Sequence, residues 1–176
     1  MNNLVIFITG PTGSGKTTVS KMLTKKINKC VNIDVDHVKH MIEYGFTKKE
    51  LSNGTIDWQY SEWKLVGDSI SLLAQNFIKE GFSVVINGYI GDEGLFSLNK
   101  KLNLTHKFLL LPDIKIIQKR DVNRSENLKM GSEMVQKHYD KFNSDNKFND
   151  FIKIDSSGQD AHQTAQKMIE IISKRF

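Results

Sequence analysis

Short apolar runs alternate with longer amphipathic segments along this chain. Five runs predict strands, at Leu4–Thr9, Val31–Asp34, Ser83–Ile86, Lys107–Leu111 and Phe151–Ile154. Segments between them predict helices at Lys16–Ile27, Asp36–Glu43, Trp58–Lys79, Glu93–Leu102, Asp113 to about Arg124, and Ser132–Phe142, with a closing helix lined by Ala161, Ala165, Met168 and Ile172. Gly45–Asp57 has no clean period, so it predicts a loop or a short helix, and polar Asn143–Asp150 predicts a loop.

Strands that alternate with helices need crossover connections, which favours an α/β fold with a parallel sheet and helices on both faces. Ligands of such sheets bind outside the carboxyl ends of the strands. This edge is expected to carry Gly10–Thr17, Asp34–Asp36, Asn87–Tyr89, Pro112-Asp113 and Asp155–Gly158.

The turn after the first predicted strand has the form G-x-x-x-x-G-K-[ST]. Its glycines allow a tight turn whose backbone N–H groups face phosphate oxygens, and the helix that follows adds the positive end of its dipole. Lys16 is expected to reach the β- and γ-phosphates, and the Thr17 hydroxyl to bind Mg²⁺. The residues expected to bind ATP are Gly10, Thr12, Gly13, Ser14, Gly15, Lys16, Thr17, Thr18, Arg120 and Arg124.

Two carboxylates, Asp34 and Asp36, follow the second predicted strand across the sheet edge from the phosphate loop. One could hold the Mg²⁺ shell, for which we take Asp34, and the other, Asp36, could accept the proton of a substrate hydroxyl. Either residue could instead cap the helix that follows, and the two roles are compatible.

Arg120 and Arg124 are two of only three arginines in the chain and share one helix face. They precede a polar segment, Ser125–Ser132, which we interpret as a small lid over the nucleotide. Their guanidinium groups suit phosphate oxygens and could stabilise the transferring phosphoryl group, so both are candidate catalytic residues with Lys16 and Asp36. The alternative is a surface pair bridged to Asp121 or Glu126.

A long insert, Tyr44–Gln75, separates the second and third predicted strands. It carries Trp58, Tyr60 and Trp63, which could wall a substrate site or could belong to the core. Asn87, Gly88 and Tyr89 are expected to face the same cleft.

Length and composition limit the class of protein. The 176 residues suffice for one domain, and no apolar run approaches the ~20 residues of a membrane helix. One cysteine excludes an internal disulfide, and the N-terminus lacks signal-peptide features, so we expect a cytoplasmic protein. The net charge of +5 is spread along the chain, which favours a solvated surface over a nucleic-acid site.

Other P-loop classes fit less well. Asn146–Asp150 is one residue too long for the N-K-x-D motif of a GTPase and precedes an apolar strand. The chain is also too short to hold the helical lid of AAA+ motors.

Taken together, Gly10–Thr17, Asp36–Met41, Gly81–Tyr89, Leu109–Arg124 and Ile154–Ser157 resemble the small P-loop kinases of metabolites and antibiotics. That family includes shikimate and gluconate kinases, and the similarity is greatest to chloramphenicol phosphotransferase-like and tunicamycin-resistance-like proteins. One departure is Asn87-Gly88 at the end of the third strand, where many relatives carry an aspartate.

The resemblance implies a P-loop NTPase three-layer fold with a five-stranded parallel sheet in the order 2-3-1-4-5, and the use of ATP and Mg²⁺. It implies that Asp36 activates the acceptor hydroxyl, that Arg120 or Arg124 is a lid arginine, and that Ser156 to Gln159 lie near the adenine. The function expected is a kinase of a small hydroxylated molecule. Alternatives are a polynucleotide 5′-hydroxyl kinase, favoured by Asn32–Asp36 and the positive charge, and a nucleotide-binding regulatory ATPase.

Overall fold

The computed structural model describes residues 3–45, 49–50, 52, 56–57, 62–126 and 129–174. Its central sheet is parallel and runs in the order β2-β5-β1-β6-β7. The strands are β1 (Val5–Thr9), β2 (Cys30–Asp34), β5 (Ser83–Asn87), β6 (His106–Leu110) and β7 (Ile152–Ile154). Counted among these five, the order is 2-3-1-4-5, which confirms the predicted topology. A short antiparallel pair, β3 (Lys49–Glu50) and β4 (Ile56–Asp57), lies within the predicted insert.

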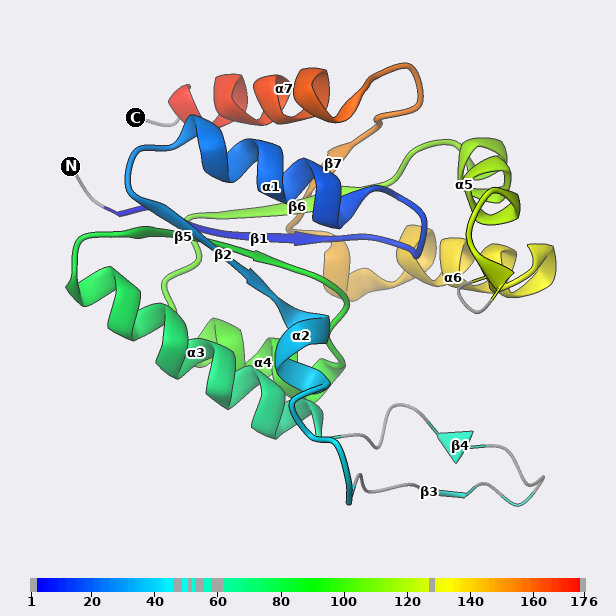
Figure 1. Cartoon of the computed structure of the whole chain (residues 1–176), viewed down its shortest axis with the longest axis horizontal. Helices are drawn as coiled ribbons and strands as arrows, with labels where there is room; N and C mark the ends of the chain where they lie inside the picture. Colours follow the sequence, from blue (N-terminus) through cyan, green and yellow to red (C-terminus); the bar gives the residue numbers. More distant parts are fainter. Residues whose placement is uncertain are drawn as a thin grey trace.

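Helices cover both faces of the sheet. On one side lie α1 (Lys16–Lys26) and α7 (Ala161–Ser173), and on the other lie α3 (Trp63–Lys79) and α4 (Asp92–Lys101) (Figure 1). Near the carboxyl ends of the strands lie α5 (Ile114–Val122) and α6 (Ser132–Ser144), while α2 (Val35–Lys39) directly follows β2. A 3₁₀ helix, η3, spans Asn146–Phe148.

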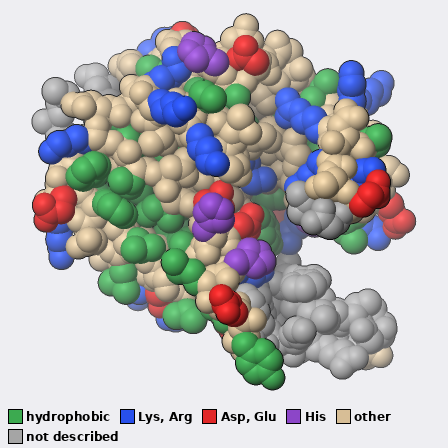
Figure 2. All heavy atoms as spheres, in the orientation of Figure 1, with side chains coloured by type: hydrophobic (Ala, Val, Ile, Leu, Met, Phe, Trp, Pro, Cys, Tyr) green, Lys and Arg blue, Asp and Glu red, His purple; other side chains and the backbone are tan. Residues whose placement is uncertain are grey.

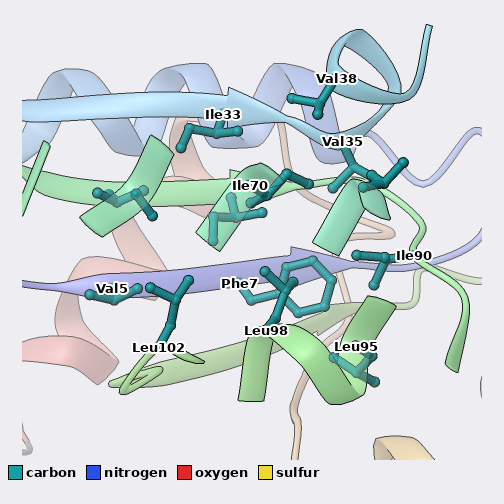
Figure 3. Packing of buried hydrophobic residues seen from close by; sticks show 14 of the residues in the cluster. Val5, Phe7, Ile33, Val35, Val38, Ile70, Ile90, Leu95, Leu98 and Leu102 are labelled. Carbon is teal, nitrogen blue, oxygen red and sulfur yellow. The ribbon is translucent and has the colours of Figure 1, made fainter. Parts of the chain in front are cut away.

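The helices on each face enclose a separate hydrophobic core. Phe7, Ile70 and Leu98 belong to the core on the α3–α4 side, where their side chains fill the space between sheet and helices (Figure 3). Ile8 and Leu23 belong to the core on the α1–α7 side. Because side chains of one strand alternate between the faces, β1 contributes to both cores and is buried throughout.

The two helices of the α3–α4 layer cross at a pair of glycines. A Cβ atom on Gly67 would lie 2.5 Å from the carbonyl oxygen of Gly94. Any side chain at Gly67 would therefore push the helices apart. The close crossing holds α3 against α4, the helix that follows β5 in the chain.

Three elements differ from the sequence prediction by more than a shift of one or two residues at a boundary. The helix predicted over Asp36–Glu43 ends at Lys39, and since Met41 and Tyr44 beyond it are exposed, burial of their side chains does not stabilise another turn. The helix predicted from Trp58 begins at Trp63, and residues 58–61 lie outside the described part of the chain. The loop predicted at Asn143–Asp150 holds the end of α6 and η3, because Phe148 is buried in the core.

Among the described residues, the helices are all too short or too polar to span a membrane.

Candidate active site

The loop between β1 and α1 has the backbone of a phosphate-binding loop. Gly10, Gly13 and Gly15 all adopt positive φ. A Cβ on Gly10 would lie 2.2 Å from the carbonyl oxygen of Leu110, so this position admits only glycine. No side chain of the described residues caps the start of α1 at Gly15, so its first N–H groups are available to an anion.

Lys16 is buried within this loop. Its Nζ donates hydrogen bonds to the carbonyl oxygens of Gly10 and Pro11, both at 2.9 Å. Burial lowers the pKa of Lys16 to about 8, although the carboxylates of Asp36 and Asp34 act in the opposite direction. A phosphate group would restore the favourable environment of the ammonium, which is the expected behaviour of a phosphate-binding lysine.

Asp34 and Thr17 provide neighbouring oxygen donors. The Thr17 hydroxyl lies 3.5 Å from Asp34 Oδ2, while Asp34 Oδ1 accepts a hydrogen bond from the Asp36 backbone N–H at 2.9 Å. The sequence did not decide which of the two aspartates caps α2, and the structure shows that Asp34 is the cap. Mg²⁺ at a phosphate site takes one or two protein oxygens, substrate phosphates and waters. The hydroxyl and carboxylate fit that pattern. Among the described residues, no group of three or more His, Cys, Asp or Glu side chains is arranged to hold a metal ion by itself.

Asp36 and Lys16 line the same cavity, which has a volume of about 450 Å³. Asp36 is exposed, and its charge is the largest of those that raise the pKa of Lys16. The cavity is lined by Gly10, Thr12, Lys16, Asp36, Lys39, Trp63, Tyr89, Met130, Met134, His138, Lys141 and Phe142. Its size is that of a small-molecule site.

The wall opposite the phosphate loop is aromatic. Trp63 packs edge to face against Tyr89, with ring centroids 5.4 Å apart, and Tyr89 in turn packs against Phe142 at 5.9 Å. Trp63 is thus both a core residue, with 4% of its surface exposed, and part of the cavity wall. The other two aromatic residues named from the sequence, Trp58 and Tyr60, lie outside the described residues.

Several cavity residues were not identified from the sequence. Met134, His138 and Lys141 share one face of α6, and Lys39 ends α2. Their spacing along a predicted helix was a usable signal, but the face that α6 presents to the sheet depends on tertiary packing. Burial and the positive charges of Lys141 and Lys16 lower the pKa of His138.

Arg120 lies on the outer side of the phosphate loop. Its guanidinium donates hydrogen bonds to the carbonyl oxygens of Gly13, at 3.2 Å, and Ser14, at 3.1 Å. It also lines a second pocket of about 270 Å³ with Thr18, Ser156 and Gln159. This pocket adjoins the phosphate loop where the resemblance placed the adenine.

Arg124 is connected to the segment between α5 and α6. Its Nη1 lies 3.8 Å from Oδ1 of the buried Asp121, which is one of the pairings expected for a structural arginine. Its charge also lowers the pKa of Lys16, so Arg124 acts on the phosphate site as well. The Asp121 carboxylate accepts hydrogen bonds from the backbone N–H groups of Met130 and Gly131. Residues 127–128 of the predicted lid lie outside the described residues.

Of the three residues expected at the end of the third strand, only Tyr89 lines the cavity. Asn87 is buried and its amide donates a 2.7 Å hydrogen bond to Asn32 Oδ1 on the α1 side of the sheet. The expectation that Asn87 faces the acceptor cleft is therefore wrong, because alternation along β5 turns its side chain away.

The cavity opens at the carboxyl ends of the strands. Figure 2 shows the surface hollowed beside α5, with Lys or Arg side chains visible inside the hollow. The parallel sheet, the phosphate loop and this adjoining cavity define a P-loop protein of the kinase-like type.

Comparisons with known proteins agree with this class. Residues 2–92 match the model of the Zeta toxin family, and the chain belongs to that family. The cytidylate kinase of Fusobacterium nucleatum is 27% identical over 128 residues, which span 62% of this chain and 56% of that relative.

Two solved structures are similar in fold along nearly the whole chain. The tunicamycin resistance protein of Deinococcus radiodurans gives a TM-score of 0.70 at 16% identity, covering 97% of this chain and 95% of the other. A sugar kinase from a Janibacter species gives 0.66 at 14% identity, with coverages of 97% and 95%. These two likenesses show the same fold, and with the family match and the cytidylate kinase relative they agree with the resemblance to P-loop kinases seen in the sequence.

Proposed function

We propose that this protein is an ATP-dependent kinase that transfers the γ-phosphoryl group to a hydroxyl of a small molecule. The observation that carries the proposal is that Lys16 of the phosphate loop and Asp36 line one cavity of about 450 Å³. A phosphate-binding group and a carboxylate that can act as a base thus line the same cavity.

The phosphate loop would hold the triphosphate through its N–H groups and Lys16. The Lys16 ammonium would leave its hydrogen bonds to the carbonyl oxygens of Gly10 and Pro11 and contact β- and γ-phosphate oxygens. Arg120 would brace the loop from outside through Gly13 and Ser14. Adenine would occupy the pocket beside Arg120 and Gln159.

Thr17 and Asp34 are the residues that would hold Mg²⁺, since their oxygens lie together at the loop. When bound, the ion neutralises charge on the β- and γ-phosphates. Because Asp34 Oδ1 is engaged by the helix N–H, its Oδ2 is the atom directed to this role.

Asp36 would act as the general base. It accepts the proton of the acceptor hydroxyl as that oxygen bonds to the γ-phosphorus. The bond between the γ-phosphorus and the β,γ-bridging oxygen breaks, and ADP leaves with that electron pair. Arg124 would turn toward the γ-phosphate, with the lid Ser125–Ser132 closing over it to exclude water.

The names of two similar proteins support phosphoryl transfer: one is a cytidylate kinase and one a sugar kinase. Their acceptors differ, so the acceptor of this chain has to be found by experiment. The volume of about 450 Å³ and the aromatic wall of this cavity favour a small molecule over a polynucleotide end.

The test is ADP release with ATP and Mg²⁺ across hydroxylated compounds: sugars, sugar acids, nucleosides, aminoglycosides, chloramphenicol, tunicamycin and a 5′-hydroxyl oligonucleotide. Lys16→Ala serves as the blank. Stimulation by one small compound supports the proposal. Stimulation by the oligonucleotide alone, weakened by salt, would favour the polynucleotide kinase. A rate that ignores every compound would favour the regulatory ATPase.

A further inference from the structure

The candidate acceptor cavity is rich in cationic side chains. Besides Lys16, which belongs to the phosphate loop, Lys39 and Lys141 line it from α2 and α6. Asp36 is the one carboxylate among the described residues that line it. A general base alone needs no additional cations, so the two further lysines call for a second role.

Aromatic contacts hold both lysines at one wall. Lys39 Nζ lies 4.1 Å from the centroid of the Trp63 ring, and Lys141 Nζ lies 5.4 Å from that of Tyr89. Lys141 also donates a 3.2 Å hydrogen bond to the Tyr89 hydroxyl. Since Trp63 and Tyr89 pack edge to face, the two ammonium groups contact two rings that lie against each other.

The cavity disfavours additional positive charge. Burial lowers the pKa of Lys39, although the charge of Asp36 acts in the opposite direction, and burial with the charges of Lys141 and Lys16 lowers the pKa of His138. An anion bound between these groups would offset the burial of Lys39 and the repulsion of His138 by the two lysines. Lys141 has three ammonium donors, of which Tyr89 takes one, so donors remain for such a ligand.

We propose that the phosphoryl acceptor carries an anionic group, a carboxylate or a phosphate, which Lys39 and Lys141 bind while the acceptor hydroxyl faces Asp36. The inference rests on the proposed function and narrows its substrate class. The aromatic wall formed by Trp63, Tyr89 and Phe142 would contact the uncharged body of the same molecule.

The test measures equilibrium binding by titration calorimetry with ADP and Mg²⁺ present. Matched probes differ by the anionic group: ribose 5-phosphate and ribose, gluconate and glucitol, cytidine 5′-monophosphate and cytidine. The proteins are the wild type, Lys39→Met, Lys141→Met and the control Lys137→Met. Lys137 lies on the same helix but is largely exposed and pairs with Glu133, so its loss changes net charge without touching the cavity. Methionine keeps the apolar stem, and thermal unfolding verifies that each variant is folded.

In at least one pair we expect the anionic probe to bind about tenfold or more tightly than its neutral partner. That advantage should fall about tenfold in Lys39→Met and Lys141→Met, and persist in Lys137→Met. The probe pair that shows this advantage indicates whether the site binds a phosphate or a carboxylate. The inference is overturned if no pair shows the advantage, or if it survives in both cavity variants. It is also overturned if these variants weaken ADP binding equally, because the lysines would then serve the nucleotide.

Failure of the kinase proposal is seen separately, in a transfer assay with ATP and the same probes. An anion advantage without transfer would leave the anion site standing and remove the kinase reaction. Equal transfer to charged and neutral probes would leave the kinase reaction standing and remove the anion site.

Discussion

The buried carboxylate of Asp121 accepts a 3.0 Å hydrogen bond from the backbone N–H of Gly131, ten residues further along the chain. It joins the end of α5 to the first residue before α6. Arg120, next to Asp121, is hydrogen-bonded to the phosphate loop, while Met130, next to Gly131, lines the cavity that holds Lys16 and Asp36. The Asp121–Gly131 bond thus joins a segment that contacts the phosphate loop to a segment that lines this cavity.

Replacing Asp121 by alanine should loosen the start of α6. The N–H groups of Met130 and Gly131 lose their acceptor, which should lower the free energy of unfolding by about 1–3 kcal/mol. Hydrogen exchange should quicken at those two amides. Asp140→Ala, an exposed position on α6, is the matched control. Unchanged exchange at Met130 and Gly131 would show that this carboxylate does not anchor the segment.

Gly10 should not tolerate alanine. Positive φ alone costs roughly 1–3 kcal/mol for a residue with a side chain. At Gly10 a Cβ would in addition lie 2.2 Å from the carbonyl oxygen of Leu110. Gly81, also at positive φ but with nothing within 4 Å of a Cβ, is the control. Chemical denaturation should show a clearly larger loss for Gly10→Ala than for Gly81→Ala, and equal losses would contradict the geometry.

Lys16→Met should separate function from stability. The buried ammonium has been removed from water and is repelled by the charge of Arg124, while two carbonyls and two aspartates stabilise it, so its loss should leave the melting temperature unchanged or raise it. Nucleotide turnover should fall by about 100-fold or more, since the charge at the β- and γ-phosphates is lost. Thermal unfolding and ADP release measure the two effects. A Lys16→Met protein that is destabilised but keeps its turnover would show that Lys16 serves stability and not function.

His138 should titrate below its ordinary pKa of 6.5 in the folded protein, as burial and the charges of Lys141 and Lys16 disfavour the imidazolium. Because the unfolded chain binds the proton more tightly, this residue's contribution to stability should be present above about pH 6.5 and decline as the pH falls below it. Imidazole NMR signals measure the pKa directly. Lys141→Met should raise the pKa of His138. An unchanged pKa would show that the charge of Lys141 does not act on His138.

The parts of the site that depend on contiguous residues were predictable. The phosphate loop follows from the spacing of Gly10, Gly15 and Lys16, and strand alternation predicted the sheet that carries it. The cap after β2 was narrowed to Asp34 or Asp36, and the backbone selects Asp34.

The residues that line the candidate acceptor cavity were harder to predict from the sequence, because they come from segments far apart in the chain. Lys39, Tyr89 and Lys141 meet only when α2, the end of β5 and α6 are packed together. Asn87 was expected in the cleft, but the pleat of β5 turns it toward Asn32. The catalytic role of Asp36, the insert Tyr44–Gln75, the lid Ser125–Ser132 and the single-domain extent of the chain remain predictions.

The central claim is that Lys16 and Asp36 together move a phosphoryl group to a hydroxyl. It is tested most directly by following the γ-phosphate of labelled ATP in the presence of the acceptor mixture. The account predicts a phosphate ester that is absent with Lys16→Met and formed about 100-fold or more slowly by Asp36→Asn, whose ATP affinity stays close to that of the wild type. Label recovered only as inorganic phosphate, at a rate independent of acceptors and equal in Asp36→Asn, would contradict it.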